Sequence, residues 1–370
     1  MARNNAAKIP EEIIFDILLW LPAKFIGQFR CVSKQWSKFL SDPQFIKAHL
    51  ALHSHKHEED KLIVVDCSLH TITFTHNTQD DFDAISRKLD FQQLSDNWVS
   101  VDGSCNGLVL AINREGVKYL INPTTLKYHK IPNFDLALPV PGIGSFSMYG
   151  LGYDVVSDDY KVVTISYYND VDETVIVDTF VDIYSVRKGL WRRLEISPYD
   201  HSVTDLASGV FVNGALHWLA SKKTSDESCV IAAFHLSDEK FLEVPLPAMD
   251  YNYSLFELVA LRGRLCMFTN LTVDTITICS MEDYGVKESW TIFRLTAPSL
   301  HDYFWTPLCS MTDDDIVMDV EEKLVLYNMK ENELWDLMVD VSPALNKART
   351  FIESLVCPSF GNGTEGQYNA

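Results

Sequence analysis

The sequence has few basic residues, no long hydrophobic run and no closely spaced cysteine pair. Its 370 residues contain 31 Lys and Arg against 51 Asp and Glu, a net charge of −20. This balance argues against sequence-independent binding to nucleic acid, because phosphate backbones attract clustered Lys and Arg. The most apolar stretch, residues 13–21, contains Asp16 and is far shorter than the roughly 20 apolar residues that span a bilayer. We therefore expect neither a nucleic-acid-binding nor a membrane-spanning protein.

The eight cysteines are scattered and form no C-x-x-C pair. Residues 1–8 are polar and lack the apolar core of a signal peptide. We therefore expect reduced thiols and a location in the cytoplasm, the nucleus or both. A composition of 47% hydrophobic and 22% charged residues is typical of a folded globular chain.

The charge is unevenly distributed. Residues 1–50 hold seven Lys and Arg against four Asp and Glu, a net +3, and the remainder holds 24 against 47, a net −23.

The first fifty residues predict short helices at 10–21, 23–29 and 32–40, with a fourth after Asp42-Pro43. Pro10 followed by two glutamates favours a helix start, and Pro22 favours a helix end.

The first predicted helix is apolar on every side, so it must be covered on every side. A module this small buries too little surface to cover it alone. The leftover face packs either on the rest of the chain or on another protein. The polar stretch at residues 54–60 is typical of a solvated connector and favours a separate module.

Short motifs across this module resemble the F-box when read in order. They are Ile9-Pro10-Glu11-Glu12, Leu21-Pro22, Phe29-Arg30-Cys31-Val32-Ser33-Lys34, Trp36, Asp42-Pro43 and Phe45. The resemblance implies docking on a Skp-type adaptor, which links an F-box protein to a cullin and a RING-type ubiquitin ligase. The adaptor contact that it implies involves Ile9, Pro10, Ile14, Ile17, Leu18, Leu21, Pro22, Ile26, Val32 and Trp36.

Two positions depart from the F-box pattern. Ile9 stands where Leu is usual, and Gly27-Gln28 stands where a Leu-Arg pair is usual. The glycine weakens the second helix by up to about 1 kcal/mol. We expect weaker adaptor binding from this change rather than its loss.

After residue 60 the sequence changes to short alternating apolar runs separated by turns, which is typical of strands. One kind of strand opening, an Asp-rich or Gly-containing turn before an apolar run, recurs at residues 60, 107, 159, 214, 263 and 315. A second recurring feature is an aromatic residue that follows an apolar strand and a polar turn. It occurs at Tyr128, Trp191, Phe241, Trp290 and Trp335, where packing on the neighbouring unit would explain it.

Six four-stranded units of about 50 residues predict a six-bladed, kelch-like β-propeller. A pair of β-sandwiches or an open solenoid is the alternative. Residues 351–357 form a predicted late strand that closes the ring beside the 60–100 unit. The fold class is thus mainly β, with a small all-α module at residues 1–50, a linker at 51–59, the propeller at 60–357 and a disordered tail at 358–370.

The propeller region resembles the plant F-box-associated domain. The motifs that carry this likeness include Gly103-Ser104-Cys105-Asn106-Gly107, Asn122-Pro123-Thr124, Gly152-Tyr153-Asp154, Asp158-Asp159-Tyr160-Lys161-Val162-Val163, Trp191-Arg192, residues 212–219 and residues 234–239. In that family the propeller recruits the protein to be ubiquitinated. The family includes immune-receptor regulators and pollen S-locus F-box proteins, and both branches stay open.

Catalytic and metal sites are weakly indicated. Cys105 stands where the nucleophile of a Gly-x-Cys-x-Gly elbow would stand, but a strand rather than a helix follows it. His53, His55 and His57 alternate before three acids, in a connector that fixes no metal geometry. His217 lies in an apolar strand and is interpreted as a hydrogen-bonded core residue. We expect no catalytic residue, no metal and no cofactor.

The long loops 136–149 and 167–178 are the better candidates for recognising a target protein, because they exceed hairpin length and carry aromatic side chains. The predicted target-binding residues are Phe146, Tyr149, Tyr167, Tyr168, Asp170 and Asp172. Acidic loop tips that share a face of the ring could attract a basic segment of the target.

The sequence therefore predicts a non-catalytic substrate-recognition subunit of a Skp–cullin–F-box ubiquitin ligase. Its partners are the adaptor, through it the cullin and RING subunit, and an unknown target protein. One alternative is a propeller enzyme or small-ligand binder with an accessory helical module. Another is an F-box protein that binds a partner without promoting its degradation.

Overall fold

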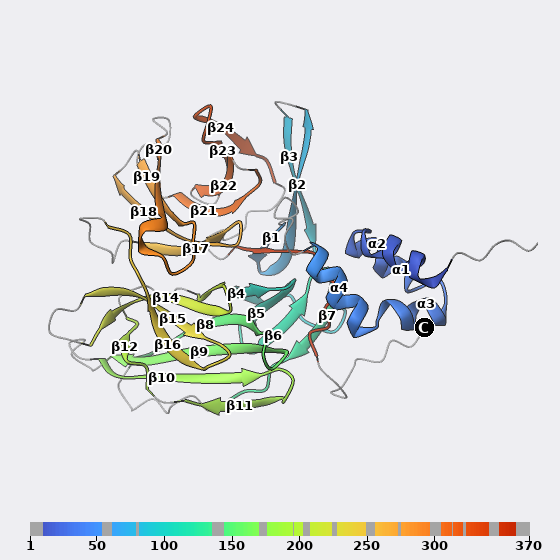
Figure 1. Ribbon diagram of the computed structural model, residues 1–370, viewed down its shortest axis with the longest axis horizontal. Helices are drawn as coiled ribbons and strands as arrows, with labels where there is room; N and C mark the ends of the chain where they lie inside the picture. Colours follow the sequence, from blue (N-terminus) through green and yellow to red (C-terminus); the bar gives the residue numbers. More distant parts are fainter. Residues whose placement is uncertain are drawn as a thin grey trace, which may run out of the picture.

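The structure is a computed structural model. It describes residues 10–53, 61–78, 81–134, 144–169, 176–194, 196–202, 208–223, 228–248, 256–272, 275–296, 305–312, 314–320, 323–339 and 348–359. Four helices precede a long series of strands, and Figure 1 shows the helices at one side of the sheets. Within the described ranges, no helix is long and apolar enough to cross a membrane.

The helices are α1 (Glu11–Leu19), α2 (Ala23–Phe29), α3 (Lys34–Leu40) and α4 (Pro43–His53). Pro10 and Pro22 immediately precede α1 and α2, and the Ser33 hydroxyl caps α3 by accepting a hydrogen bond from the Trp36 backbone N–H at 3.2 Å. The four predicted helices are confirmed. Helix α4 continues to His53 and so includes the first residues of the predicted linker, while residues 54–60 lie outside the described ranges.

The strands form six sheets in the described part of the chain. The first, in the order β25-β1-β2-β3, contains β25 (Arg349–Phe351), β1 (Lys61–Asp66), β2 (Ser68–Thr78) and β3 (Asp81–Lys88). The second contains β4 (Trp98–Cys105), β5 (Leu108–Asn113), β6 (Lys118–Asn122) and β7 (Lys127–Lys130). The third contains β8 (Gly144–Asp154), β9 (Asp159–Asn169), β10 (Ile176–Ser185) and β11 (Leu190–Arg193).

The other three sheets repeat this pattern. The fourth contains β12 (Tyr199–Asp200) and β13 (Val210–Val212), both paired with β14 (Ala215–Lys222), then β15 (Cys229–His235) and β16 (Lys240–Val244). The fifth contains β17 (Glu257–Leu261), β18 (Arg264–Thr272), β19 (Thr275–Met281) and β20 (Trp290–Thr296), and the short helix η3 (Lys287–Ser289) connects the last two strands. The sixth contains β21 (Trp305–Ser310), β22 (Asp315–Val320), β23 (Lys323–Asn328) and β24 (Glu333–Leu337).

The innermost strands of the six sheets contact one another in a closed circle. Strand β25 contacts β4, β4 contacts β8, β8 contacts β13, β13 contacts β17, β17 contacts β21, and β21 contacts β25. A solenoid would leave two free ends, and a sandwich pair would not form a circle. The fold is a six-bladed β-propeller, as predicted.

Hydrophobic clusters between neighbouring blades hold the ring together. The cluster that closes it joins Leu62 and Ile72 of the first blade to Leu326 and Leu337 of the sixth. The recurring aromatics lie on the outermost strands, and two of them reach the preceding blade. The indole N–H groups of Trp191 and Trp290 donate to the carbonyl oxygens of Pro132 (2.7 Å) and Pro245 (2.8 Å).

Ring closure differs in detail from the prediction. The closing strand is β25, Arg349–Phe351, paired antiparallel with β1, and residues 352–357 are not a strand. Hydrogen bonds to a side chain take the place of strand pairing here, because the Asn122 amide donates to the carbonyl oxygens of Ser354 and Val356. Leu355 packs with the helices and Val356 with the propeller.

The blade order gives the ring two distinct faces. Hairpins β4–β5, β6–β7 and β8–β9 share one face, which we call the helix face because α4 packs there beside Leu108 and pairs with Asp158. The β5–β6 connection, the C-terminal end of β9 and the N-terminal end of β10 lie at the opposite, distal face, because successive antiparallel turns alternate between faces.

Candidate functional site

The helical module exposes large apolar side chains. Ile13 and Ile17 of α1 and Trp20, its C-cap residue, are 49%, 54% and 62% exposed. They share one side of the helix, since residues at i, i+4 and i+7 align. Phe25 of α2 and Val32 in the turn after it are 48% and 67% exposed. Apolar surface gathered on so small a module is typical of a protein-binding site.

The residues predicted to contact the adaptor divide into three groups. Pro10, Ile17, Pro22 and Val32 are exposed, and Ile14, Leu21 and Trp36 are half-buried. Leu18 and Ile26 are 3% and 0% exposed and lie in the core of the module. The sequence predicted adaptor contacts for both, whereas here they pack inside the module. For Leu18, a helix that is apolar on every side does not reveal from sequence which side is covered. Ile9 lies outside the described residues.

Three exposed apolar residues were missed as site residues: Ile13, Trp20 and Phe25. The signal for the first two was present in the sequence, because α1 has more apolar residues than one buried face can accommodate. They were missed because the adaptor-contact residues were taken only from positions that match the F-box motif.

The core of the module contains a residue from the other end of the chain. Leu18, Ala23, Ile26, Leu40 and Phe45 pack with Leu355, which is 3% exposed. Phe15 meets Phe39 and Phe45 edge-on, with ring centroids 5.9 and 5.3 Å apart.

Helix α4 is tied to α1 by two buried histidines. The His49 and His53 rings stack at 4.3 Å, and their Nε2 atoms lie 2.8 and 3.0 Å from the carbonyl oxygens of Leu21 and Leu19. These carbonyls accept the hydrogen bonds, so each Nε2 carries the proton. Burial lowers the pKa of His49, which favours the neutral ring in the folded module.

The other side of α4 packs on the propeller. Ile46 and Leu50 contact a cluster that includes Leu108 and Tyr160. Lys47 forms an ion pair with Asp158 at 2.7 Å, in the β8–β9 turn. The Lys47 ammonium and the Tyr153 hydroxyl lower the pKa of Asp158. Helix α4 therefore contacts both modules, whereas the sequence favoured a separate helical module; the predicted solvated connector, residues 54–60, lies outside the described residues.

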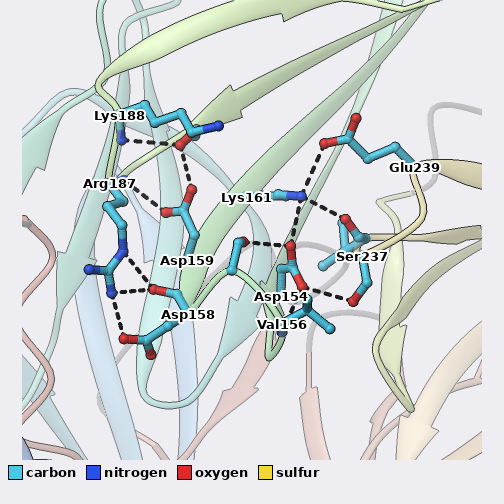
Figure 2. Close-up of polar contacts among 12 residues, drawn as sticks. Asp154, Val156, Asp158, Asp159, Lys161, Arg187, Lys188, Ser237 and Glu239 are labelled. Atoms are coloured by element: carbon cyan, nitrogen blue, oxygen red, sulfur yellow. Dashed lines mark hydrogen bonds and ion pairs between the residues drawn. The ribbon is translucent and has the colours of Figure 1, made fainter.

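A network of polar side chains supports this turn and joins the third and fourth blades. Figure 2 shows the Lys161 ammonium between two carboxylates, Asp154 at 2.9 Å and Glu239 at 3.1 Å. Lys161 also donates to the carbonyl oxygen of Leu236 at 2.6 Å. Burial acts to raise the pKa of Asp154, but hydrogen bonds from Ser157, Lys161 and Ser237 outweigh it and lower that pKa.

The sites at which the sequence suggested chemistry have structural roles. Cys105 ends β4 in a hydrophobic cluster, and burial raises the pKa of its thiol, which opposes formation of a nucleophilic thiolate. His217 donates from Nδ1 to the Val210 carbonyl oxygen (2.9 Å) and accepts at Nε2 from the Tyr284 hydroxyl (2.7 Å), as expected of a core residue. His55 and His57 lie outside the described ranges, which contain no metal-ligand cluster.

The predicted target-binding aromatics lie in strands, where loops were expected. Phe146 and Tyr149 are half-buried in β8, and Tyr167 is 4% exposed in β9. Tyr167 stacks on Phe146, with ring centroids 5.4 Å apart, so it was wrongly expected at the surface. The backbone of Tyr168 also belongs to β9. Asp170 and Asp172 lie outside the described residues.

Protein-family models match both the helical module and the propeller. A model described as "F-box domain" matches residues 7–48. A model described as "F-box associated beta propeller domain" matches residues 54–347, most of the chain. The chain belongs to this F-box-associated propeller family. Both resemblances noted in the sequence are confirmed, and members of the F-box family are typically non-catalytic adaptors.

Curated relatives match this chain over most of their own length. "F-box protein CPR1" of Arabidopsis thaliana is 28% identical over 95% of this chain and 89% of its own. An Arabidopsis thaliana F-box/kelch-repeat protein is 27% identical over 95% of this chain and 96% of its own. Among solved structures, dipeptidyl peptidase 4 of Porphyromonas gingivalis matches at 9% identity and a TM-score of 0.39, over 77% of this chain and 53% of its own.

Proposed function

We propose that this F-box protein is the substrate-recognition subunit of a Skp–cullin–F-box ubiquitin ligase. The observation that carries the proposal is the exposed apolar surface of the F-box, formed by Ile13 and Ile17 of α1, its C-cap residue Trp20, Phe25 and Val32. F-box domains in general bind Skp-type adaptors, and an adaptor would cover this surface.

The propeller would hold the target protein. The F-box occupies the helix face beside the second and third blades, where α4 packs, which leaves the distal face for a target. Phe146 and Tyr149, both half-buried in β8, are candidate contacts, because aromatic side chains contribute strongly to protein interfaces. Tyr168, Asp170 and Asp172 remain candidates from the sequence.

The proposed mechanism is proximity. The propeller would hold the target near a ubiquitin-conjugating enzyme that the cullin and RING subunit bring. This chain would then contribute no catalytic group and would act by raising the effective concentration of the target at the conjugating enzyme. A fixed orientation between the two modules makes this efficient. The α4 contacts through Ile46, Lys47 and Leu50 support a fixed orientation.

We also propose a location in the cytoplasm or nucleus. All eight cysteines lie in the described residues and none forms a disulfide, which suits a reducing compartment. Microscopy of a fluorescent fusion tests this, and retention in the secretory pathway would contradict it.

The test of the main proposal is co-expression with a Skp-type adaptor, followed by size-exclusion chromatography. The unmodified chain is expected to elute as a one-to-one complex. Ile17→Asp places a charge at the centre of the exposed α1 surface and is expected to abolish the complex. Leu190→Asp is a matched control, because Leu190 is 67% exposed on β11 of the propeller. An unmodified chain that elutes separately from the adaptor would contradict the proposal.

A further inference from the structure

The C-terminal residues 352–357, which we call the strap, lie outside both family-model matches, which end at residues 48 and 347. The strap nevertheless contacts both modules. It begins directly after β25, the strand that closes the ring, and the ion pair between Lys61 and Glu353 reinforces its start.

The propeller grips the strap through buried polar contacts. Asn122, fully buried, donates from Nδ2 to the carbonyl oxygens of Ser354 (3.1 Å) and Val356 (2.8 Å). The Ser354 backbone N–H donates to the Thr124 hydroxyl at 3.3 Å. The backbone of Gly107 approaches so closely that a Cβ there would lie 2.2 Å from the Ser354 Oγ.

The next two residues face opposite modules. Leu355 fills the F-box core between Leu18 and Ile26 of α1 and α2 and Leu40 of α3. Val356 joins the propeller cluster that also receives Ile46 and Leu50 of α4. The F-box core is therefore incomplete without a residue that the closed ring positions.

We propose that the strap is a functional part of the adaptor-binding module, and that it couples adaptor binding to ring closure. Because Leu355 is supplied by the segment after β25, the F-box keeps its binding shape only while β25 is paired with β1. Linkage is reciprocal, so adaptor binding would in turn stabilise the last strand. The role in adaptor binding rests on the function proposed above.

Two truncated chains and two substitutions of Leu355 test this proposal. A chain ending at Ser359 keeps the strap, whereas a chain ending at Glu353 lacks Leu355 and Val356. Leu355→Ala removes only the core side chain. Its matched control is Ser359→Ala, since Ser359 is half-exposed and its hydroxyl lies beside the nearby Cys357 thiol. Leu355→Val is a milder variant that preserves most of the side chain.

The first readout is amide hydrogen exchange in α1–α3 without adaptor, and the second is adaptor affinity. Leu355→Ala is expected to speed exchange in these helices about 30-fold or more and to weaken adaptor binding, while exchange in β14 and β15 stays unchanged. Leu355→Val should speed it several-fold. The chain ending at Glu353 should lose adaptor binding, and the chain ending at Ser359 should keep it.

Wild-type exchange and affinity in both Leu355 variants would overturn the proposal. If the unmodified chain failed to bind adaptor, the proposed function would fail, but the exchange readout would still decide whether the strap completes the F-box. Slow exchange in β14 and β15 distinguishes a loosened F-box from a chain that is unfolded throughout. If Leu355→Ala unfolds the whole chain, exchange and adaptor affinity of the milder Leu355→Val variant decide the proposal.

Discussion

Asn122 donates a hydrogen bond to the carbonyl oxygen of Val356 at 2.8 Å and so joins the second blade to the C-terminal strap. Its Oδ1 also accepts from the backbone N–H groups of Thr124 and Thr125 at 2.8 and 3.0 Å. One buried amide thus shapes the β6–β7 turn and holds the strap. This double role accounts for the Asn122-Pro123-Thr124 motif in physical terms.

Gly107→Ala tests how tightly the strap is held. Gly107 has φ +79° and a Cβ there would meet Ser354, whereas Gly214 has φ +76° in the same kind of Asn-Gly turn with no atom within 4 Å of a Cβ. Both substitutions strain a left-handed residue by about 1 kcal/mol. Gly107→Ala alone adds the clash.

We therefore expect Gly107→Ala to lower the free energy of unfolding by at least about 1 kcal/mol more than Gly214→Ala, because overpacking typically costs 1–3 kcal/mol. Urea denaturation of both variants measures the difference. Equal losses would mean that the strap does not press on this turn.

The propeller was predictable because its signals are local and repeated. Five of the predicted strand openings precede the second strands of blades two to six, β5, β9, β14, β18 and β22. The opening at residue 60 precedes β1, which is also a second strand because β25 is the first of its blade. Turn residues and alternation determine such features without reference to distant parts of the chain.

The site was only partly predictable, because its decisive contacts are distant in sequence. No local pattern places Leu355 beside Leu40, or Lys47 beside Asp158. The sequence between residues 144 and 169 was interpreted in part as loops, but it forms the long hairpin β8–β9. Strand pairing over this length decides the conformation of residues such as Tyr167. Nearby glycines and polar residues made this segment resemble a loop in the sequence.

Stability should fall in mild acid because buried histidines are held neutral. Burial lowers the pKa of His217 to about 4, against about 6.5 in an unfolded chain. The unfolded state therefore binds the proton first, so the contribution is complete above pH 6.5 and is lost as the pH falls towards 4. For His217 the loss is about 2 kcal/mol at pH 5.

His217→Gln removes this titration. Denaturation between pH 7 and pH 5 is expected to give a shallower decline for the variant than for the unmodified chain. His201, whose pKa burial lowers to about 3, contributes a decline of the same sign in both proteins. Identical slopes in the two proteins would contradict a neutral, buried His217.

Lys161→Met should be far more damaging than Arg187→Met. Lys161 and Asp154 are 9% and 3% exposed, whereas Arg187 and its partner Asp158 are 43% and 35% exposed. Removing Lys161 leaves a buried carboxylate unpaired, at a cost of about 3 kcal/mol. An exposed pair contributes about 1 kcal/mol or less. Urea denaturation distinguishes the two, and equal losses would show that the Lys161 pair is effectively solvated.

Hydrogen exchange of the intact chain with and without a Skp-type adaptor tests the central claim most directly, because it locates the bound surface. We predict slower exchange in α1, α2 and the turn that contains Val32, with no change in the outer strands β11, β16 and β20. Unchanged exchange in α1 and α2 at saturating adaptor, or slowing confined to the propeller, would contradict the account.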